Sequence, residues 1–446
     1  MKKIANKPNN PAKRIVILGG GPAGIGAAWR FKELGHKNWE LYEKTDFLGG
    51  LSASFKDTKG FIWDIGGHIY FSKNDYFNRV FKKLMGKDFL KKERFQYIWQ
   101  DNALMPYPFQ NNIRHLPERE LDECLKGLAN PKKIKPKNFL EFNLASFGSG
   151  ITKHFMKPYN EKVWSYPLAK MAFNWVGGRV SRIDFNKALE NVIFEKDEAN
   201  WGPNFYFNYP IKNGSGDFWS RFLPKLKDNI IFNSQFEKIS FKKREVRLKD
   251  GKTINYDYLV SALPLDYLIY NSDAPKKIKK AAGKLVHNSG FILGLGVKGK
   301  QPEFLNNKVA FYFSQKKVLF QRMLAFKNFS PHVVPKNHWS LIFEASFSKH
   351  KPMAKEELVK NAIGFAKKQK WIKSDKDIKS IFIKEFRYFY PIPTLDRDKN
   401  LNLIQKELQN KKVYSIGRFG AWKYEQGNMD HSFMQGVEAA EQISKK

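Results

Sequence analysis

The chain contains very little cysteine: Cys124 is the only one among its 446 residues. A single thiol excludes a disulfide within the chain and any metal cage built from cysteines, so we expect neither a disulfide framework nor a metal site. This usage fits a reducing compartment, because disulfides persist mainly in oxidising ones.

Acidic residues are scarce relative to basic ones. The sequence has 79 Lys and Arg against 43 Asp and Glu, which gives a formal net charge of +36 at pH 7. Such an excess can indicate a nucleic-acid or acidic-lipid partner. The lysines are scattered in short clusters and do not form one basic arm. We therefore expect a Lys-rich surface and no nucleic-acid partner.

Long hydrophobic runs are missing as well. No uninterrupted apolar stretch approaches the ~18 residues that a membrane-spanning helix needs. The basic residues 1–14 are followed by a short apolar run, 15–18, that ends at a glycine cluster and is too short for the hydrophobic core of a signal peptide. We expect no membrane span, no signal peptide and a cytoplasmic location.

What the chain does contain is typical of a folded protein. Apolar residues make up 42% and aromatic residues 15%, and at roughly 100–200 residues per domain this length predicts two or three domains. Hydrophobic periodicity predicts the elements in chain order. They are a strand–turn–helix–strand unit over 14–43, mostly helices over about 75–200, alternating strands over about 230–265 and 290–350, a helix over 354–370, a last strand over 411–417, and a final helix over about 431–444.

A glycine-rich turn follows the first strand. The segment Gly19-Gly20-Gly21-Pro22-Ala23-Gly24 fits the pattern G-x-G-x-x-G. In this pattern Gly19 permits the tight turn, Gly21 lets the backbone approach a pyrophosphate, and Gly24 lets helix and strand pack closely. The helix N-terminus supplies N–H groups to phosphates, and Glu43 at the end of the second strand can accept hydrogen bonds from ribose hydroxyls. A structural turn alone would explain the glycines, but the complete set predicts dinucleotide binding.

Two glycine doublets follow soon afterwards, in Leu48-Gly49-Gly50 and in Asp64-Ile65-Gly66-Gly67-His68. Paired glycines let backbone lie against a flat ring or a phosphate without an intervening side chain. Each doublet alone is explained by a plain turn. Together with the first motif they favour FAD over NAD, because such doublets recur in flavoproteins of the amine-oxidase type. We expect His68 to contact the isoalloxazine ring.

The C-terminal region has a second pair of glycine motifs, Gly417-Arg418-Phe419-Gly420 after a strand and Gly427-Asn428-Met429-Asp430-His431-Ser432 before a helix. Asp430 or Ser432 can cap that helix, whose N-terminus can face the N1–C2=O edge of a flavin that carries negative charge when reduced. Because the first and last segments both have this design, we expect one sheet interrupted by insertions.

With these residues assembled, the sequence resembles the UDP-galactopyranose mutases of the longer eukaryotic type, within the amine-oxidase-like flavoprotein superfamily. The resemblance covers nearly the whole chain, and generic flavin oxidases lack its middle segments. The specific segments are PYPFQNN (106–112), KPYNEKVW (157–164), GGRV (177–180), NWGPN (200–204), YPIPTL (390–395) and residues 417–439.

The residue pattern and the resemblance together imply an α/β fold with three parts. We expect a discontinuous Rossmann-type FAD-binding domain, an inserted helical domain, and an antiparallel β-sheet domain that binds substrate. Their expected boundaries are 12–80, 210–270 and 405–446 for the first, 81–185 for the second, and 186–209 with 271–404 for the third.

The resemblance implies an FAD-dependent isomerase that interconverts UDP-galactopyranose and UDP-galactofuranose. Reduced flavin N5 is the nucleophile that attacks the sugar anomeric carbon in such enzymes. The flavin must therefore be reduced, with NADPH or NADH as the expected reductant, although the overall reaction is redox-neutral. We expect no protein nucleophile.

The resemblance also implies site residues. Arg179 and Arg322 hold the diphosphate, as an arginine fork binds planar oxygen groups, and they join His68 as the catalytic set. Tyr107 stacks on uracil and Gln110 bonds its edge. The substrate-binding set is Tyr107, Gln110, Phe155, Asn160, Trp164, Asn204, Tyr312, Tyr390 and Tyr424. The cofactor-binding set is Gly19, Gly21, Gly24, Glu43, Gly49, Gly50, Gly66, Gly67, His68, Arg418, Asn428, Asp430 and Ser432.

Two other functions stay open on the sequence alone. An FAD-dependent oxidase or desaturase of an amine, a carotenoid or a porphyrinogen shares the cofactor motifs, although it needs an apolar or amine-selective cage instead of paired arginines. A non-catalytic nucleotide- or nucleic-acid-binding protein fits the charge but leaves the flavin motifs unexplained. The sequence does not decide between galactose and an N-acetyl or deoxy relative, and it does not indicate an oligomeric state.

Overall fold

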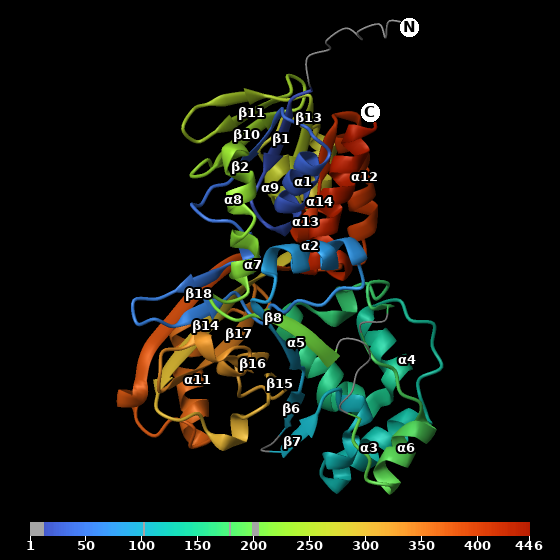
Figure 1. Ribbon diagram of the computed structural model, residues 1–446. Coiled ribbons are helices and arrows are strands. Elements are labelled where there is room, and N and C mark those ends of the chain that lie inside the picture. The colour runs from blue at the N-terminus through green and yellow to red at the C-terminus, as the bar shows by residue number, and fades with distance from the viewer. Residues whose placement is uncertain (1–12, 101–102, 178–179, 199–204) are drawn as a thin grey trace, which may run out of the picture.

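A computed structural model describes residues 13–100, 103–177, 180–198 and 205–446. Figure 1 shows a parallel-sheet part with the C-terminus at the top, a second sheet below it, and a group of helices beside that second sheet. No helix within the described residues is long and apolar enough to cross a membrane.

The first part is built on a five-stranded parallel sheet. Its order is β19–β13–β1–β2–β9, with the strands paired in parallel throughout. Strand β1 is central and entirely buried, as expected for an apolar run covered on both faces. The strands are β1 (Ile15–Leu18), β2 (Trp39–Tyr42), β9 (Ile230–Ile231), β13 (Tyr258–Ser261) and β19 (Val413–Ser415).

Two helices from opposite ends of the chain pack against each other on this sheet. They are α1 (Pro22–Glu33) and α14 (Met429–Ser444). A Cβ added at Gly26 would lie 2.1 Å from the carbonyl oxygen of Phe433, and one added at Gly436 would lie 2.0 Å from that of Ala23. The glycines therefore allow backbone-to-backbone contact, and this contact joins the two nucleotide-facing motifs.

This sheet confirms the predicted α/β class with a discontinuous Rossmann-type domain. Its strands come from each of the three segments expected for the FAD-binding domain, 12–80, 210–270 and 405–446. The exact domain boundaries stay predictions.

The second sheet has seven strands in the order β18–β14–β17–β16–β15–β6–β7. Its pairings are antiparallel, except that β15 pairs with β6 in parallel. Helix α11 (Lys355–Lys368) packs its buried face on the sheet. The strands are β6 (Gln96–Gln100), β7 (Ala103–Pro106), β14 (His287–Lys298), β15 (Ala310–Phe313), β16 (Arg322–Ala325), β17 (His338–Phe347) and β18 (Ile378–Pro391).

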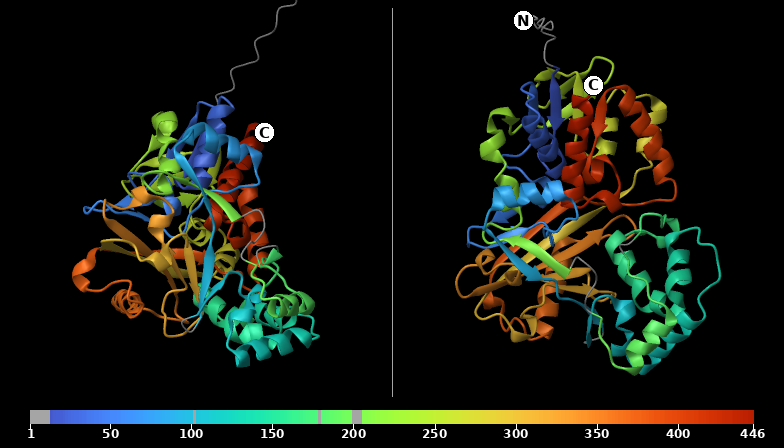
Figure 2. Two further views of the ribbon diagram at one scale, coloured as in Figure 1. Left: turned by 60° about the horizontal axis from the view of Figure 1, so that its bottom comes forward. Right: turned by 45° about the vertical axis from the view of Figure 1, so that its right-hand side comes forward.

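The helical expectation for residues 75–200 is wrong over part of its length. Three strands lie there, β6, β7 and β5 (Phe89–Glu93), and β5 pairs with β8 (Tyr206–Pro210). Strand β5 pairs with the remote β8, and β6 pairs with the remote β15 as well as with the adjacent β7. A short local pattern could not indicate the remote pairings. Figure 2 shows the remaining helices of this region as a separate group beside the second sheet. They are α3 (Glu118–Ala129), α4 (Phe139–Ile151), α5 (Lys157–Trp164) and α6 (Phe185–Ile193).

The final helix begins two residues earlier than expected, at Met429. Its N-cap is Asn428, and no side chain makes a capping hydrogen bond there. The prediction that Asp430 or Ser432 caps this helix is therefore wrong, because both lie inside its first turn.

The other elements are β3 (Ser54–Lys56), β4 (Ile62–Asp64), α2 (Asp75–Met85), α7 (Gly216–Ser220), α8 (Leu223–Leu226), β10 (Phe236–Ser240), β11 (Glu245–Leu248), β12 (Thr253–Asn255), α9 (Leu265–Tyr270), α10 (Lys276–Ala282), α12 (Arg397–Asn410) and α13 (Gly417–Gly420).

Candidate active site

One cavity collects residues from all three parts of the fold. Its volume is about 680 Å³, and its lining comes from the second glycine doublet, helix α5, strands β15 to β18 and the segment before α14. A larger cavity of about 990 Å³ lies against β5 and is lined mainly by lysines and amides. That larger cavity holds none of the predicted site residues, so the motifs and not the volume identify the candidate site.

The first glycine turn has the geometry of a phosphate cradle. Gly19 has φ +97°, a Cβ at Gly24 would lie 1.9 Å from the Gly19 carbonyl oxygen, and a Cβ at Gly21 would meet nothing within 4 Å. The backbone at Gly21 is thus open at the N-terminus of α1, where N–H groups and the helix dipole favour an anion.

Glu43 is held against this turn. One of its carboxylate oxygens accepts a hydrogen bond from the backbone N–H of Gly20 at 2.6 Å, and the other accepts two from the N–H and hydroxyl of Thr45 at 2.9 Å each. The carboxylate is buried. It therefore has a defined position beside the open turn, where a ribose hydroxyl can reach it.

The two glycine doublets lie in different places, the first at the phosphate turn and the second in the cavity wall. Gly49 has φ +111° and donates its N–H to the carbonyl of Gly20 at 2.8 Å, while a Cβ at Gly50 would lie 3.2 Å from the Gly21 Cα. In the second doublet, Gly66 has φ +85°. The first doublet therefore packs against the phosphate turn, and the second lines the cavity.

His68 lies in the wall of the cavity as a neutral imidazole. Burial, followed by the positive charges of Arg418 and Arg322, lowers the pKa of His68 to about 3. Its Nδ1 is buried and has no hydrogen-bond partner among the described residues. An unpaired buried nitrogen is costly, so its position fits a polar group of a bound flavin or substrate.

Arg322 has its guanidinium on an acid of the neighbouring strand. Its Nη2 donates to Oε1 of Glu344 at 2.6 Å. Burial lowers the pKa of Arg322, but Glu344 and the nearby tyrosines raise it by more, so the net pKa lies well above its ordinary value. The side chain of Arg322 keeps 22% exposure, against 2% for Glu344, and it lines the cavity.

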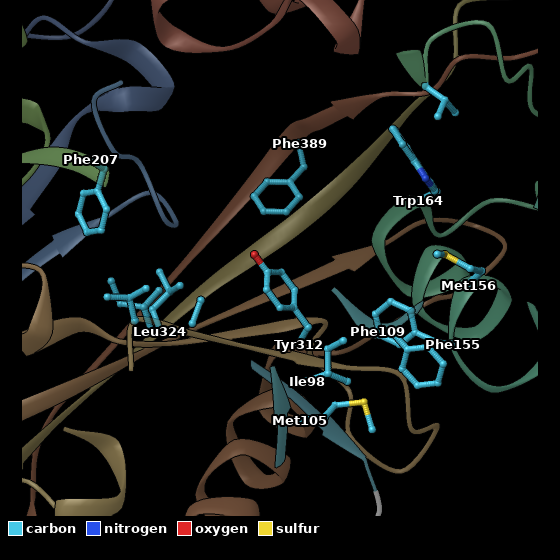
Figure 3. Packing of buried hydrophobic residues seen from close by; sticks show 14 of the residues in the cluster. Ile98, Met105, Phe109, Phe155, Met156, Trp164, Phe207, Tyr312, Leu324 and Phe389 are labelled. Atoms are coloured by element: carbon cyan, nitrogen blue, oxygen red, sulfur yellow. The ribbon is translucent and has the colours of Figure 1, made fainter. Parts of the chain in front are cut away.

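Tyrosines form much of the remaining wall. The rings of Tyr107 and Tyr312 lie 4.9 Å apart, and those of Tyr390 and Tyr424 lie 5.7 Å apart. Burial raises the pKa of Tyr107 and of Tyr390 above the ordinary value, so both remain neutral donors at physiological pH. Figure 3 shows the Tyr312 ring standing over the packing of Ile98 and Met105, with its hydroxyl directed away from them.

Helix α5 contributes Asn160 and Trp164, which are one turn apart on the same face. The indole Nε1 of Trp164 donates to Oδ1 of Asn160 at 3.2 Å, and Asn160 donates to the carbonyl of Met156 at 2.7 Å. The Trp164 ring packs edge-on against Tyr424 at 4.9 Å. Both predicted residues thus line the cavity.

Tyr424 is supported from behind by an ion pair. Arg397 at the start of α12 is almost fully buried and binds Glu425 through a fork of two hydrogen bonds, at 3.0 and 2.8 Å. Bidentate pairs fix orientation as well as distance. The segment that carries Tyr424 is therefore fixed against the start of helix α12.

Two predicted substrate residues lie outside the cavity lining. Phe155 is buried between Phe109 and Tyr159, with ring centroids 4.8 and 4.9 Å away, and Figure 3 shows the Phe109–Phe155 stack. The amide of Gln110 is also buried and donates to the carbonyl of Ser181 at 2.5 Å. These residues support the wall from behind, and their predicted contact with substrate stays a prediction.

Arg179 and Asn204 fall outside the described residues. The C-terminal motifs are described, and Arg418, Asn428 and Asp430 line the cavity. Arg418 donates to the carbonyl of Gly427 at 2.9 Å, and Asp430 accepts from the hydroxyl of Ser72 at 2.7 Å. Ser432 is buried behind them and does not contribute to the lining.

Sequence reasoning missed several lining residues, namely Arg94, Tyr159, Trp175 and Glu344. Arg94 follows a lysine-rich run that is typical of a solvent-exposed surface. Its Nε is nevertheless buried, with no hydrogen-bond partner among the described residues. Glu344, by contrast, could have been identified as a candidate from the sequence. It is the only acid in the apolar strand β17, and a charge in a buried strand predicts a cationic partner.

Comparisons with known proteins agree with this geometry. Residues 22–444 match the family model of flavin-containing amine oxidoreductases. A solved structure of reduced UDP-galactopyranose mutase is 38% identical in sequence to this chain and superimposes on it with a TM-score of 0.94. The match covers 97% of this chain and 94% of the chain of that mutase. Cyclohexylamine oxidase from Brevibacterium oxydans is 12% identical, with a TM-score of 0.70 and a match that covers 98% of this chain and 99% of the oxidase chain. At this identity the likeness shows a shared fold alone.

A curated relative matches over a shorter region. The zeta-carotene desaturase of Arabidopsis thaliana is 25% identical over 150 residues, which are 33% of this chain and 26% of that protein. The chain thus spans about a quarter of the length of this relative, which carries no argument about substrate.

Proposed function

The chain belongs to the flavin-containing amine oxidoreductases, and we propose from that premise that it interconverts UDP-galactopyranose and UDP-galactofuranose. The solved mutase is similar over nearly its whole length, which places the chain among the UDP-galactopyranose mutases. The cofactor is FAD, and the protein is an enzyme of the isomerase type.

The observation that carries this function is the combination of Arg322 with tyrosine hydroxyls in a cavity beside the flavin-facing turn. A diphosphate carries negative charge and planar oxygen groups, which an arginine and neutral hydroxyl donors satisfy. An amine substrate would bring a positive charge next to Arg322 and Arg418, and a carotenoid would leave these groups unpaired. The oxidase and desaturase alternative is therefore not favoured.

The residues present fit FAD. The open turn at Gly21, with the carboxylate of Glu43 and the first doublet beside it, offers a place for the pyrophosphate and ribose. The second doublet lines the cavity together with His68, whose buried Nδ1 has no hydrogen-bond partner among the described residues. When bound and reduced, the flavin supplies the nucleophile N5 for the anomeric carbon of the sugar, with no net oxidation or reduction.

The chain's own groups bind and orient the substrate. Arg322 stabilises the negative charge that develops on the diphosphate as UDP departs, and we propose Arg179 as the second arginine in this role. Tyr312, Tyr390 and Tyr424 donate neutral hydrogen bonds to the same group. Because the pKa of His68 is about 3, its imidazole stays neutral and adds no charge beside the sugar.

The uridine end of the cavity is proposed to lie between Tyr107 and helix α5. Tyr107 offers a ring face for stacking on uracil, worth ~1–3 kcal/mol in nucleic-acid sites, and Asn160 and Trp164 continue that wall. Gln110 supports the segment from behind. NADPH or NADH is proposed as the reductant, and the low cysteine usage favours a cytoplasmic location.

Incubation of dithionite-reduced protein with UDP-galactofuranose, followed by chromatography, tests this function. We expect UDP-galactopyranose to appear with reduced protein and not with oxidised protein, because only reduced flavin supplies the nucleophile. Equal conversion by the oxidised protein would exclude the flavin-nucleophile mechanism. Oxygen consumption with amines, without conversion of the UDP-sugar, would support the oxidase alternative.

A further inference from the structure

Glu344 is a buried acid at the centre of the second sheet. It lies on β17 directly opposite Arg322 of β16 in the antiparallel register, and it is 1% exposed. A buried carboxylate destabilises the fold unless it is paired and hydrogen-bonded. The two hydrogen-bond donors that contact it show what it holds in place.

One oxygen of Glu344 makes both contacts. Oε1 accepts from Arg322 Nη2 at 2.6 Å and from the backbone N–H of Gly67 at 2.9 Å. A Cβ added at Gly66 would lie 2.8 Å from that same oxygen, so the turn that precedes His68 packs directly on the carboxylate. Glu344 thus connects a side chain of the second sheet to the second glycine doublet.

The connection matters because its two ends face different parts of the cavity. Arg322 faces the position proposed for the diphosphate, and the Gly66–His68 turn faces the position proposed for the flavin ring. In the proposed reaction UDP leaves the sugar and returns to it, so the cation and the turn must keep a fixed separation. Misplacement by about 1 Å can cost about 10²-fold in rate.

We propose that Glu344 is a positioning residue for the isomerisation, holding Arg322 and the Gly66–His68 turn as one unit. This inference rests on the proposed function. Glu344 has no role of its own in breaking or forming bonds, since its charge is committed to Arg322. Its effect is on the geometry of the cation and on the electrostatics beside the flavin.

The variant Glu344→Gln tests both effects. The amide oxygen can still accept from Gly67 and from Arg322, but the negative charge that holds the guanidinium is lost. The site then has one more net positive charge, so UDP binds with the same affinity or more tightly, while kcat falls about tenfold or more because Arg322 is held less firmly. A residue needed only for folding would instead reduce UDP affinity, FAD content and kcat together.

The flavin midpoint potential provides a readout independent of turnover. Removing a negative charge near a flavin that is anionic when reduced stabilises the reduced form, so we expect a positive shift in Glu344→Gln. The matched control is Glu385→Gln, at an exposed position on β18 of the same sheet, where kcat, UDP affinity and potential should equal those of the wild type.

Titration of FAD-loaded protein with UDP, redox potentiometry and steady-state turnover make up the test. A kcat and a potential in Glu344→Gln that equal those of the Glu385→Gln control would overturn the proposal. If Glu344→Gln fails to retain FAD, Glu344→Asp keeps the charge on a shorter side chain, and we expect reduced kcat with an unchanged potential. Wild-type kcat in Glu344→Asp would then overturn the proposal. Absence of turnover in the wild type contradicts the proposed function instead, a result distinct from both.

Discussion

At the scale of single residues, Arg322 combines charge, position and accessibility. It is paired with Glu344, yet its side chain remains 22% exposed toward the cavity. In Arg322→Ala we expect kcat/KM to fall about 10²–10³-fold, the range seen when a preorganised charge-stabilising donor is removed, while the flavin spectrum is retained. Steady-state kinetics of reduced enzyme measure this.

The matched control for that change is Arg387→Ala, at an exposed position on β18. It removes the same charge from the protein but not from the cavity. Similar losses of kcat/KM in the two variants would show that Arg322 does not act in the site and that the loss comes from a general effect of charge.

Asp64 shows how burial at a single residue makes stability depend on pH. Its carboxylate accepts hydrogen bonds from Ser54 and Tyr209 at 2.5 and 2.7 Å, but complete burial is the larger effect and raises its pKa from 3.8 to about 6. The folded state then retains a proton that the unfolded state releases. This contribution favours folding fully below about pH 4 and is lost as the pH rises through 6.

We therefore expect Asp64→Asn to change the pH dependence of stability. At 1.36 kcal/mol per pKa unit, the wild type should lose about 2 kcal/mol of unfolding free energy relative to Asp64→Asn between pH 4 and 7. Denaturant unfolding of both proteins across this range measures the difference. A constant difference between the two proteins would show that Asp64 titrates normally.

At the scale of elements, the contact between α1 and α14 depends on glycine. A Cβ at Gly436 would lie 2.0 Å from the Ala23 carbonyl oxygen and 2.5 Å from the Ala27 nitrogen. Gly436→Ala should separate these helices, weaken FAD retention because α1 carries the phosphate turn, and lower the unfolding free energy by about 1–3 kcal/mol. Thermal unfolding and the bound-flavin content measure these effects.

Gly364 in α11 provides the matched control, since a Cβ there would meet nothing within 4 Å. In a helix interior, Gly364→Ala should raise the unfolding free energy by about 0.5–1 kcal/mol. Equal effects of the two substitutions would show that helix propensity, and not helix contact, decides the outcome.

At the scale of the whole molecule, the net charge of +36 attracts an anionic substrate over distances longer than any contact. Salt screens such attraction, with a Debye length of about 8 Å at physiological ionic strength. We expect the KM for the UDP-sugar to rise about threefold or more between 0.05 and 0.5 M KCl, while kcat changes little. A KM that does not change with salt concentration would show that the net charge does not contribute to substrate capture.

Much of the cofactor region could be predicted from the sequence by itself. The glycine turn at 19–24 and Glu43 beside it have the local geometry that their motif predicted, because such features depend on short spacings that the chain encodes directly. The contacts of these residues and of the two doublets with FAD stay predictions. The interrupted parallel sheet was also expected, since its first and last segments share one design. Family membership followed from short motifs in a set order.

Only the tertiary structure decided the interior of the site. The pairing of Glu344 with Arg322 and Gly67, the neutral state of His68 and the position of Gln110 behind the wall all depend on partners remote in the chain. Desolvation and packing distances exist only once the sheets and helices have come together, and local periodicity does not report them. Strand β5 was missed for the same reason, because its partner β8 is remote in the chain. The adjacent pair β6 and β7 was missed although its pairing is local.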